Sequence, residues 1–519
     1  MTQSQVSENV ATSSSNEDWV DRFLRFSESK TLSIALAFLF SFAMFAYYQF
    51  LSPFIPGTDG YYHIKFAYLM RTEGFLKTFP WASMSIWSEK FYDKEFLYHV
   101  YLIPFTYFKD LTFGAKLATA LLASVSTTSF YAILRLNKIR LSSLWFLLLM
   151  SGGAYFLYRN NVPRPQVLSI VLALWSIHFV INKRKVALFI LGVVYAFSYT
   201  AYFLPVVFAC IVSGYLYVFE DELEWKVPAV TITAMLAGML LHPYFPNNFT
   251  YLYLQNFYVL WMSVQKKVNL RMGNEFGPMT TRQLLGGNAA VVTAYISVFF
   301  FSLYRPRPVS KTTRNMFFLS LAVILLTFHT KRFTEYSVPI TLLFCGFYFH
   351  HQLEDINLVE LWRTQRQNFM MWAGGVALLV LSLGVGSFVG TSRSFKSSPP
   401  RHKGAALYLK KHTKKDEVVF TCDWDDGPEL IYYNHKNRYL VLLDPNFMYF
   451  WKPKLWVKWN RLAHGNFGRK TYEVLKKDFK VRYGVCTREF WSLRKMINKD
   501  SRIKIVYSDK ETYVFKLKP

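Results

Sequence analysis

The chain has 519 residues, of which 52% are hydrophobic and 19% aromatic, and its mean hydropathy is +0.15. So much apolar surface cannot be hidden inside one water-soluble globule, which excludes that class and predicts a polytopic membrane protein. The formal net charge is +27. Because Lys and Arg gather in short loops between apolar runs, membrane topology and anionic lipid headgroups account for this charge, and we expect no nucleic-acid partner.

The first long apolar run, residues 31–51, carries no charge and is long enough to cross a hydrocarbon core about 30 Å thick. A cleaved signal peptide is the alternative, but the preceding segment is long, polar and partly acidic, and no small-residue cleavage site follows the run. We therefore expect a retained first span after a disordered cytoplasmic tail, residues 1–30. Similar runs predict about eleven to thirteen spans in all. The candidates are 31–52, 111–134, 141–158, 165–181, 186–200, 201–219, 228–244, 288–304, 315–329, 333–350 and 369–390, of which 186–219 is alternatively one long broken helix.

Basic loops predict the orientation of these spans, because positive residues favour the cytoplasmic side. The loops concerned hold Arg22, Arg25, Lys30, Arg135, Lys138, Arg140, Lys183, Arg184, Lys185, Arg305, Arg307, Lys311 and Arg314. With the N-terminus in the cytoplasm and an odd number of spans, the loops 52–110 and 243–287 lie outside. The sequence thus predicts a transmembrane domain over 31–391 and an external or periplasmic α/β domain over 392–519, in a plasma (inner) or ER-type membrane.

The first external loop contains the motif GTDGYYHIK, residues 57–65, with an acid, Asp59, just outside the first span. The apolar and aromatic residues that follow recur at helical spacing, so we expect an amphipathic helix resting on the bilayer surface. Asp59 is interpreted either as a cap of this helix or as a functional acid that takes a divalent cation or orients an amide or hydroxyl.

The other external segments supply one acid and several basic residues. Glu275 lies in NEFGP, either as a solvent-facing turn acid or as part of a site, and the aromatic run 249–261 before it is suited to a lipid-linked or sugar substrate. Lys331 and Arg332 lie at the external end of a span, and Arg164 lies in RNNVPRPQ. Contact with anionic lipid is one interpretation of these residues, and a phosphate or pyrophosphate clamp is the other.

In the C-terminal domain, alternating strand-like and helix-like runs predict a small α/β layer. DWDDG, residues 423–427, and Asp444 follow two of the strands, and ligands gather at the carboxyl ends of parallel strands. The turn is interpreted either as a generic acidic turn or as a binding site for a peptide, a sugar or a metal. Cys422 and Cys486 are able to pair in this domain, but nothing in their spacing requires it.

In this order the motifs resemble the catalytic subunit of oligosaccharyltransferase, a family of C-class glycosyltransferases that move a glycan from a polyprenyl phosphate carrier to a protein asparagine. The resemblance implies that Asp59 binds metal and contacts the acceptor amide, with Glu275 as its partner. It implies that Arg332 binds the donor phosphate or the acceptor amide, and Lys331 and Arg164 are further candidates for binding the donor phosphate. The acceptor-binding residues implied by the DWDDG segment and its downstream strand are Trp424, Asp425, Asp426 and Gly427, with a further match at Asp444.

Two departures from the family pattern bear on this expectation. The family's second acidic motif should fall near 151–166, but that segment has no acid. A Mg or Mn ion would be held by Asp59, Glu275 and neutral oxygens such as Asn160 or Asn161, which are few charged ligands for a hard cation. Asp423 and Asp426 also replace the Trp and the Tyr of the peptide-reading motif, so recognition of an Asn-x-Ser/Thr acceptor does not carry over.

The resemblance therefore implies an α-helical polytopic membrane glycosyltransferase, with Asp59 and Glu275 as its catalytic residues. Its donor would be a polyprenyl-phosphate-linked sugar or oligosaccharide, and its acceptor a protein or glycan on the external face. Two other functions stay open. A transporter or flippase of a lipid-linked glycan intermediate would share the spans and arginines, and a non-catalytic membrane assembly protein would account for the missing acidic pair.

Overall fold

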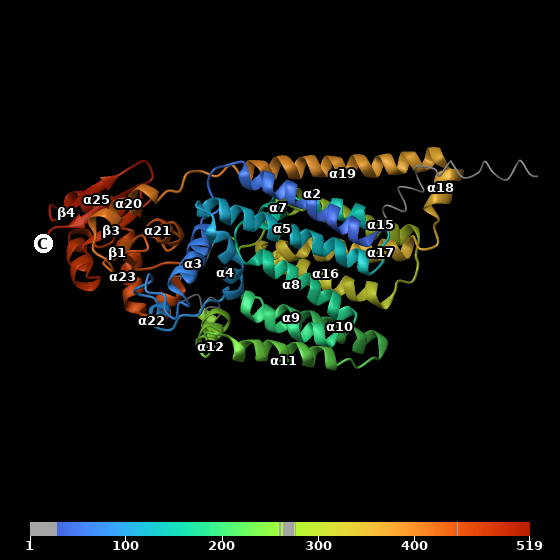
Figure 1. The fold of residues 1–519 in the computed structure, drawn as a ribbon, viewed down its shortest axis with the longest axis horizontal. Helices are drawn as coiled ribbons and strands as arrows, with labels where there is room; N and C mark the ends of the chain where they lie inside the picture. The colour runs from blue at the N-terminus through green and yellow to red at the C-terminus, as the bar shows by residue number, and fades with distance from the viewer. Residues whose placement is uncertain (1–28, 259–260, 263–274, 276, 444) are drawn as a thin grey trace, which may run out of the picture.

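The structure is a computed structural model that describes residues 29–258, 261–262, 275, 277–443 and 445–519. Two parts lie end to end along the long axis of the molecule: a helical bundle and a C-terminal α/β domain (Figure 1). The disordered tail expected at 1–30, most of the loop before Glu275, and Asp444 fall largely or wholly outside the described residues.

Each apolar run of the sequence contains at least one helix. The bundle helices are α2 (Lys30–Phe50), α5 (Leu111–Leu136), α6 (Ser142–Met150), α7 (Ala154–Arg159), α8 (Gln166–Ile181), α9 (Lys185–Ser198), α10 (Leu204–Glu220), α11 (Lys226–Leu241), α14 (Thr281–Gly287), α15 (Ala289–Tyr304), α16 (Lys311–His329), α17 (Thr334–Gln352), α18 (Leu358–Thr364) and α19 (Arg366–Ser394). The run 186–219 forms two helices, α9 and α10, rather than one.

Only some of these helices have the length and apolar composition of a membrane span. Among the described residues, α2, α5, α16 and α19 meet both conditions, and α14 with α15, bent by 81°, adds a fifth if the pair is one span. Helices α8 to α11 are apolar but shorter. The finding supports a membrane protein, whereas the expected count of eleven to thirteen spans stays a prediction.

The bundle is built around α5, which is buried along most of its length between α2 and α8. Serine and threonine hydroxyls are satisfied inside the bundle: Thr127 of α5 donates to Ser41 of α2 at 2.9 Å. Helix α19 runs along the outside of the bundle (Figure 1), and nearly all its side chains are exposed. An exposed helix with so many apolar side chains is suited to contact lipid.

The loop 52–110 is folded between the bundle and the α/β domain. It contains α3 (Asp59–Glu73), η1 (Ile86–Ser88), α4 (Phe96–Leu102) and η2 (Ile103–Tyr107). Figure 1 shows α3 in this position, and nine of its fifteen residues are buried. The expectation of an amphipathic helix on the bilayer surface is therefore wrong, because the aromatic residues of α3 pack against protein on several sides.

The C-terminal domain is an α/β layer with one five-stranded sheet in the order β2-β1-β3-β5-β4. Strand β1 pairs in parallel with β2 and β3, whereas β5 pairs antiparallel with β3 and β4. Its elements are α20 (Lys403–His412), β1 (Val418–Thr421), α21 (Gly427–Tyr433), β2 (Arg438–Tyr439), α22 (Pro445–Trp451), α23 (Pro453–Ala463), η6 (Gly468–Lys470), α24 (Thr471–Glu473), η7 (Val474–Asp478), β3 (Tyr483–Thr487), α25 (Trp491–Lys499), β4 (Ile503–Ser508) and β5 (Thr512–Leu517).

A disulfide joins two segments of this sheet, and the loop 52–110 contacts its edge. Cys422, just after β1, pairs with Cys486 of β3, with their Cα atoms 5.1 Å apart. The loop segment around Ala82 forms a parallel bridge to Tyr439 of β2, and the indole of Trp81 donates to the carbonyl of His435 at 2.8 Å. The loop therefore covers the outer edge of β2.

Candidate functional site

Three acids and three arginines meet where α3, the end of α7 and the start of α17 come together. We call this set the charged cluster. Its members are Asp59, Arg159, Arg164, Glu275, Arg332 and Glu335.

Asp59 is the first residue of α3, and the N-cap position is taken by Thr58. The cap interpretation of Asp59 is therefore wrong by one residue, although an acid in the first turn still interacts favourably with the helix dipole. One carboxylate oxygen, Oδ2, lies 2.9 Å from Nε of Arg164. About one third of the side chain is exposed, so the carboxylate is reachable from the outside.

Arg164 joins the two acids singled out from the sequence. While its Nε contacts Asp59, its Nη1 lies 3.2 Å from Oε2 of Glu275. Asp59 comes from the loop 52–110 and Glu275 from the loop 243–287, and the side chains of both contact the same guanidinium. A planar guanidinium with several fixed N–H directions is suited to this double contact, whereas a lysine ammonium is not.

Glu275 is surrounded by guanidinium groups. Its Oε2 contacts Arg159 at 2.8 Å and Arg164 at 3.2 Å, and its Oε1 contacts Arg332 at 3.0 Å. Burial alone would raise the pKa of this carboxyl, but Arg332, Arg159 and Arg164 outweigh that effect and lower the pKa to about 2. Glu275 is therefore a permanent anion at neutral pH that holds three cations in place.

The structure adds residues that the sequence analysis did not single out. Glu335, in the first turn of α17, is fully buried and accepts from Nε of Arg159 at 2.5 Å. Arg332 donates to the hydroxyl of Tyr199, which lies between α9 and α10. A usable signal existed for Glu335: it is an acid within a predicted span, and such residues are commonly functional.

Lys331 precedes Arg332 of the charged cluster and forms no ion pair with an acid in the described part of the chain. Its backbone N–H donates to the carbonyl of Gly277 at 3.0 Å, and Thr330 donates its hydroxyl to the carbonyl of Glu275 at 3.0 Å. These two bonds fasten the segment at Glu275 to the end of α16. They explain how a short loop segment keeps its carboxylate among the arginines.

The donor set does not fit the metal that the resemblance implies. Both carboxylate oxygens of Glu275 form ion pairs with guanidinium groups, and one carboxylate oxygen of Asp59 forms an ion pair with Arg164. Asn161 uses its amide toward the bundle interior, where it donates to the carbonyl of Phe45 and accepts from Gln49. A Mg or Mn ion needs several free oxygens, and here it would share its ligands with three fixed cations.

The DWDDG turn approaches the charged cluster through Asp425. Its carboxyl keeps contact with solvent, yet desolvation by the surrounding protein, followed by the charges of Asp59, Asp423 and Asp426, raises its pKa to about 6. Asp59 and Asp425 are thus close enough to interact electrostatically across the junction between the bundle and the domain. Trp424 is half-buried beside Asp425.

The other two residues of the expected acceptor set lie inside the domain. Asp426 is buried and contacts Nε2 of His402 at 2.8 Å. Gly427 begins α21 against Leu442, which lies 2.8 Å from where a Cβ would be. These two residues shape the turn, whereas Asp425 is exposed and Trp424 is half-buried against the core of the domain.

Two apolar grooves follow α15 and α16. The first, of about 570 Å³, is lined by residues that include Asn288, Thr327 and Ser337, and the second, of about 530 Å³, is lined by residues that include Arg314. Tyr295 and Phe299 line both. Ser337 of the first groove lies on α17 two residues after Glu335, on a different side of the helix.

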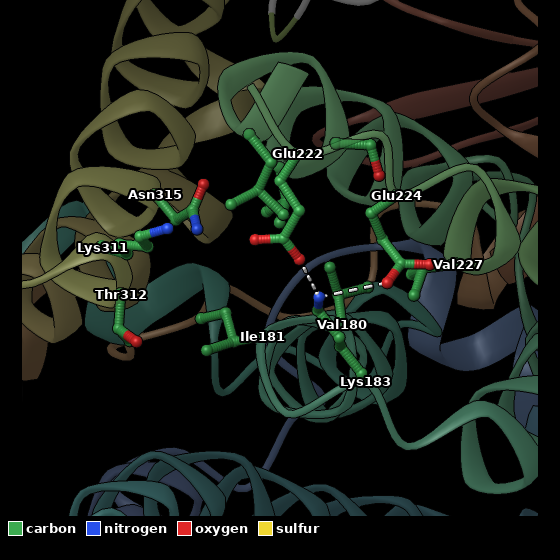
Figure 2. Close-up of a pocket in the computed structure, with 12 residues that line it drawn as sticks. Val180, Ile181, Lys183, Glu222, Glu224, Val227, Lys311, Thr312 and Asn315 are labelled. Carbon is green, nitrogen blue, oxygen red and sulfur yellow. Dashed lines mark hydrogen bonds and ion pairs between the residues drawn. The ribbon is translucent and has the colours of Figure 1, made fainter. Parts of the chain in front are cut away.

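A separate polar pocket of about 170 Å³ lies at the opposite end of α16 (Figure 2). Lys183 contacts Glu222 at 2.5 Å and Glu224 at 3.1 Å there, and Lys311 lies across the pocket. Lys311 begins α16 and the charged cluster follows its end, so the two sites are about 27 Å apart along the helix. This pocket is not part of the site.

No known family model matches the chain, and no curated protein matches its sequence. Solved structures do match its fold. The oligosaccharyltransferase of Archaeoglobus fulgidus in the apo form has a TM-score of 0.64 and 11% identity, over 88% of this chain and 70% of that one. The same protein, AglB, in complex with an inhibitory peptide and a dolichol-phosphate also has a TM-score of 0.64 and 11% identity, over 92% and 72% of the two chains.

ArnT from Cupriavidus metallidurans bound to undecaprenyl phosphate matches with a TM-score of 0.59 and 12% identity, over 93% of this chain and 97% of that one. The resemblance to C-class glycosyltransferases is thus confirmed at the level of the fold. At 11 to 12% identity, the likeness is one of fold, and the sequences are far diverged.

Proposed function

We propose that the protein is a membrane glycosyltransferase that moves a sugar or oligosaccharide from a polyprenyl-phosphate-linked donor to an acceptor on the external face. The observation that carries this proposal is the pairing of Asp59 with Arg164 inside a cluster of three arginines. Ser337 of the first apolar groove lies on the same helix as Glu335 of the cluster, and Asp59 interacts electrostatically with Asp425 of the DWDDG turn. Such a site combines a base, cations for a phosphate and space for a lipid chain. The shared fold with an oligosaccharyltransferase supports it.

The reaction would be a single displacement at the anomeric carbon. Asp59 accepts the proton of the acceptor nucleophile while the nucleophile forms its bond to that carbon. The bond between the anomeric carbon and the phosphate oxygen breaks, and its electron pair leaves with the phosphate. Arg332, Arg164 and Lys331 neutralise the charge that develops on the leaving group.

The roles of the two acids differ because their surroundings differ. Glu275, with its pKa lowered to about 2, is a poor proton acceptor at neutral pH, so its role is to hold Arg159, Arg164 and Arg332 in position. Asp59 has one guanidinium contact and is one third exposed, which leaves it accessible to an acceptor. We therefore assign Asp59 as the base and Glu275 as a positioning residue.

The lipid chain of the donor would lie in the apolar grooves along α15 and α16, with its phosphate at the charged cluster. The acceptor would enter from the side of the α/β domain, where Trp424 offers an aromatic surface and Asp425 a carboxyl of raised pKa. A buried Arg-rich end and an apolar groove are what a phosphate attached to a long hydrocarbon requires.

The location follows from the disulfide and from the topology argument. A Cys422–Cys486 bond is stable in an oxidising compartment and rare in the cytosol. This supports an external or periplasmic C-terminal domain, a cytoplasmic N-terminus, and a plasma (inner) or ER-type membrane.

The test uses the full-length protein in lipid nanodiscs with a radiolabelled polyprenyl-phosphate-linked sugar. We expect label to move to an acceptor protein or glycan, or slowly to water, and we expect Asp59→Asn to abolish the transfer. Asp110→Asn is the matched control, because Asp110 is also an external acid, but it caps α5 through the N–H of Thr112 at 2.8 Å. Full transfer by Asp59→Asn would refute the mechanism.

A second arm uses the same protein in sealed vesicles. Movement of the labelled lipid across the bilayer with no transfer would favour the transporter instead. Neither movement nor transfer, with a folded protein, would favour the assembly role.

A further inference from the structure

A second group of titratable side chains lies beneath Asp59, outside the charged cluster. It consists of His63 on α3, Asp93 and Glu95 in the segment before α4, and His99 on α4. All four side chains are buried: His99 is 0% exposed, Asp93 2%, His63 5% and Glu95 7%. The proposed transfer reaction uses none of them.

The four side chains point at one another. Nδ1 of His63 lies 2.9 Å from Nε2 of His99, and Nδ1 of His99 lies 2.8 Å and 3.0 Å from the two oxygens of Asp93. One ligand atom from each of His63, Glu95 and His99 can be chosen so that all three lie within 4.8 Å of one another. Two imidazole nitrogens and one carboxylate oxygen therefore converge on a common point.

The surroundings are aromatic and closed. The ring of Phe66 lies 4.7 Å from that of His99, and the rings of Tyr62 and Tyr98 lie 5.0 Å and 5.3 Å from that of His63. Inside this shell, the carboxyl of Glu95 is buried and has Lys94 at 3.6 Å. A buried carboxyl is costly unless a cation compensates it.

We propose that His63, Glu95 and His99 bind a structural Zn²⁺ ion. Two His nitrogens and one carboxylate oxygen are a common zinc set, and imidazole ligands favour zinc over Mg²⁺ or Ca²⁺. Tetrahedral zinc with Zn–N bonds of about 2.05 Å separates two nitrogens by roughly 3.3 Å, so the imidazoles need to move apart by only about 0.4 Å.

Asp93 completes the arrangement without touching the metal. By accepting from Nδ1 of His99, it fixes the tautomer that leaves Nε2 free to coordinate, as carboxylates behind zinc-bound histidines do. The set supplies three protein ligands, so a water would fill the fourth tetrahedral position, and the low exposure of all four residues favours a role in structure over one in binding substrate.

The position of the site gives it a consequence for Asp59. His63 follows Asp59 by four residues, so it lies roughly 6 Å further along the same face of α3. An ion there would join α3 to α4 and to the Asp93–Glu95 segment. It would hold the helix that carries Asp59 against the bundle, and it would do so whether or not the protein transfers a sugar.

The competing arrangement is a metal-free hydrogen-bonded chain. In it, Asp93 accepts from His99, His99 accepts from His63, and Lys94 compensates Glu95 from 3.6 Å. The two arrangements differ in metal content, which is measured directly.

The test is the zinc content of the full-length protein, purified in detergent and exchanged into metal-free buffer. We expect about one zinc per chain by elemental mass spectrometry. We expect Glu95→Gln and His99→Gln to lower this content at least tenfold, and Asp93→Asn to weaken zinc binding roughly 10- to 100-fold. His242→Gln is the control, because His242 is a buried histidine in the neighbouring aromatic region, where it accepts from the N–H of Tyr244.

A second measurement covers variants that fold poorly. Wild-type protein stripped with a chelator and refilled with Co²⁺ should show the visible absorption of tetrahedral Co²⁺, and its Tm should rise with Zn²⁺ but not with Mg²⁺. A wild-type chain that carries no zinc and takes up no Co²⁺ would overturn the proposal, as would full zinc content in both Glu95→Gln and His99→Gln.

Discussion

The guanidinium of Arg164 contacts Asp59 through Nε at 2.9 Å and Glu275 through Nη1 at 3.2 Å. It joins an acid from the loop 52–110 to an acid from the loop 243–287. The site is therefore assembled only when both loops are folded against the bundle.

Arg164→Ala should lower transfer by roughly 10²-fold, because one cation that stabilises the departing phosphate is lost and Asp59 loses its orientation. Arg164→Lys should retain the charge but not the double contact, so its rate should lie between those of the wild type and the alanine variant. Initial rates with the labelled donor measure this. Arg401→Ala, at an exposed ion pair with Glu489, is the control. Equal rates in the wild type and both variants would contradict the prediction.

Glu275→Gln should destabilise the protein, because three arginines lose their shared anion. Removing one partner of a buried ion pair costs about 3–5 kcal/mol, and since Glu275 is partly exposed we expect about 2 kcal/mol here. Thermal unfolding of the purified protein at pH 7 tests the direction of this change. A higher Tm in Glu275→Gln than in the wild type would show that the arginines do not need this carboxylate.

The lowered pKa of Glu275 predicts that the protein loses stability at acid pH. The folded-state pKa of Glu275 is lowered from its ordinary value of 4.5 to about 2. Its contribution is therefore complete above pH 4.5 and is lost as the pH falls from 4.5 to about 2. In a series of Tm measurements over this range, the wild type should lose its advantage over Glu275→Gln. A constant difference between the two proteins would be inconsistent with the lowered pKa.

Asp425 predicts a pH dependence of the opposite sign. Its folded-state pKa is raised from 3.8 to about 6, so the folded protein binds more protons than the unfolded chain between these values. The stability of the wild type relative to Asp425→Asn should fall as the pH rises from about 4 to 6, and should then stay lower at pH 7. Glu489→Gln, at an exposed site, should show no such trend. Because Asp425 is solvent-exposed, only the direction is predicted.

Breaking the Cys422–Cys486 disulfide should destabilise the α/β domain by about 4 kcal/mol, a value that follows from the length of the closed loop. The double variant Cys422→Ser, Cys486→Ser should be cleaved faster by protease within the domain than the wild type. Mass spectrometry after alkylation without reductant should label Cys210 but neither cysteine of the pair. Labelling of Cys422 in the native protein would contradict the disulfide.

Much of the architecture was predictable because apolar runs and strand patterns are local signals. The helices at residues 30–50 and 111–136 follow directly from long apolar runs, and the α/β domain follows from alternating patterns. The number of spans was less accessible, since several apolar helices, such as α9 and α11, are shorter than a bilayer is thick. Whether such a helix spans the bilayer depends on where the helix ends and on what it packs against. Neither is visible in the apolar run alone.

The site was predictable in part. Asp59, Arg164, Glu275 and Arg332 were singled out from short motifs, and the structure brings them together. Glu335 belongs to none of these motifs, and its position within a predicted span was the one local signal that pointed to it. The burial of α3 was missed for a related reason: its tyrosines resemble interface anchors, whereas their actual partners, such as Tyr432 against Tyr61, lie more than 300 residues away.

The contact between the loop 52–110 and strand β2 also affects how the chain folds while it is being synthesised. Trp81 and His435 are joined by a hydrogen bond across 354 residues. At about 5–20 residues per second, the ribosome needs roughly 20 to 70 seconds to make the chain between them. During that interval the loop has been made while its partner strand does not yet exist. The nascent protein therefore spends roughly 20 to 70 seconds with the aromatic side chains of this loop not covered by β2, and a chaperone that binds exposed aromatic residues would act in that interval.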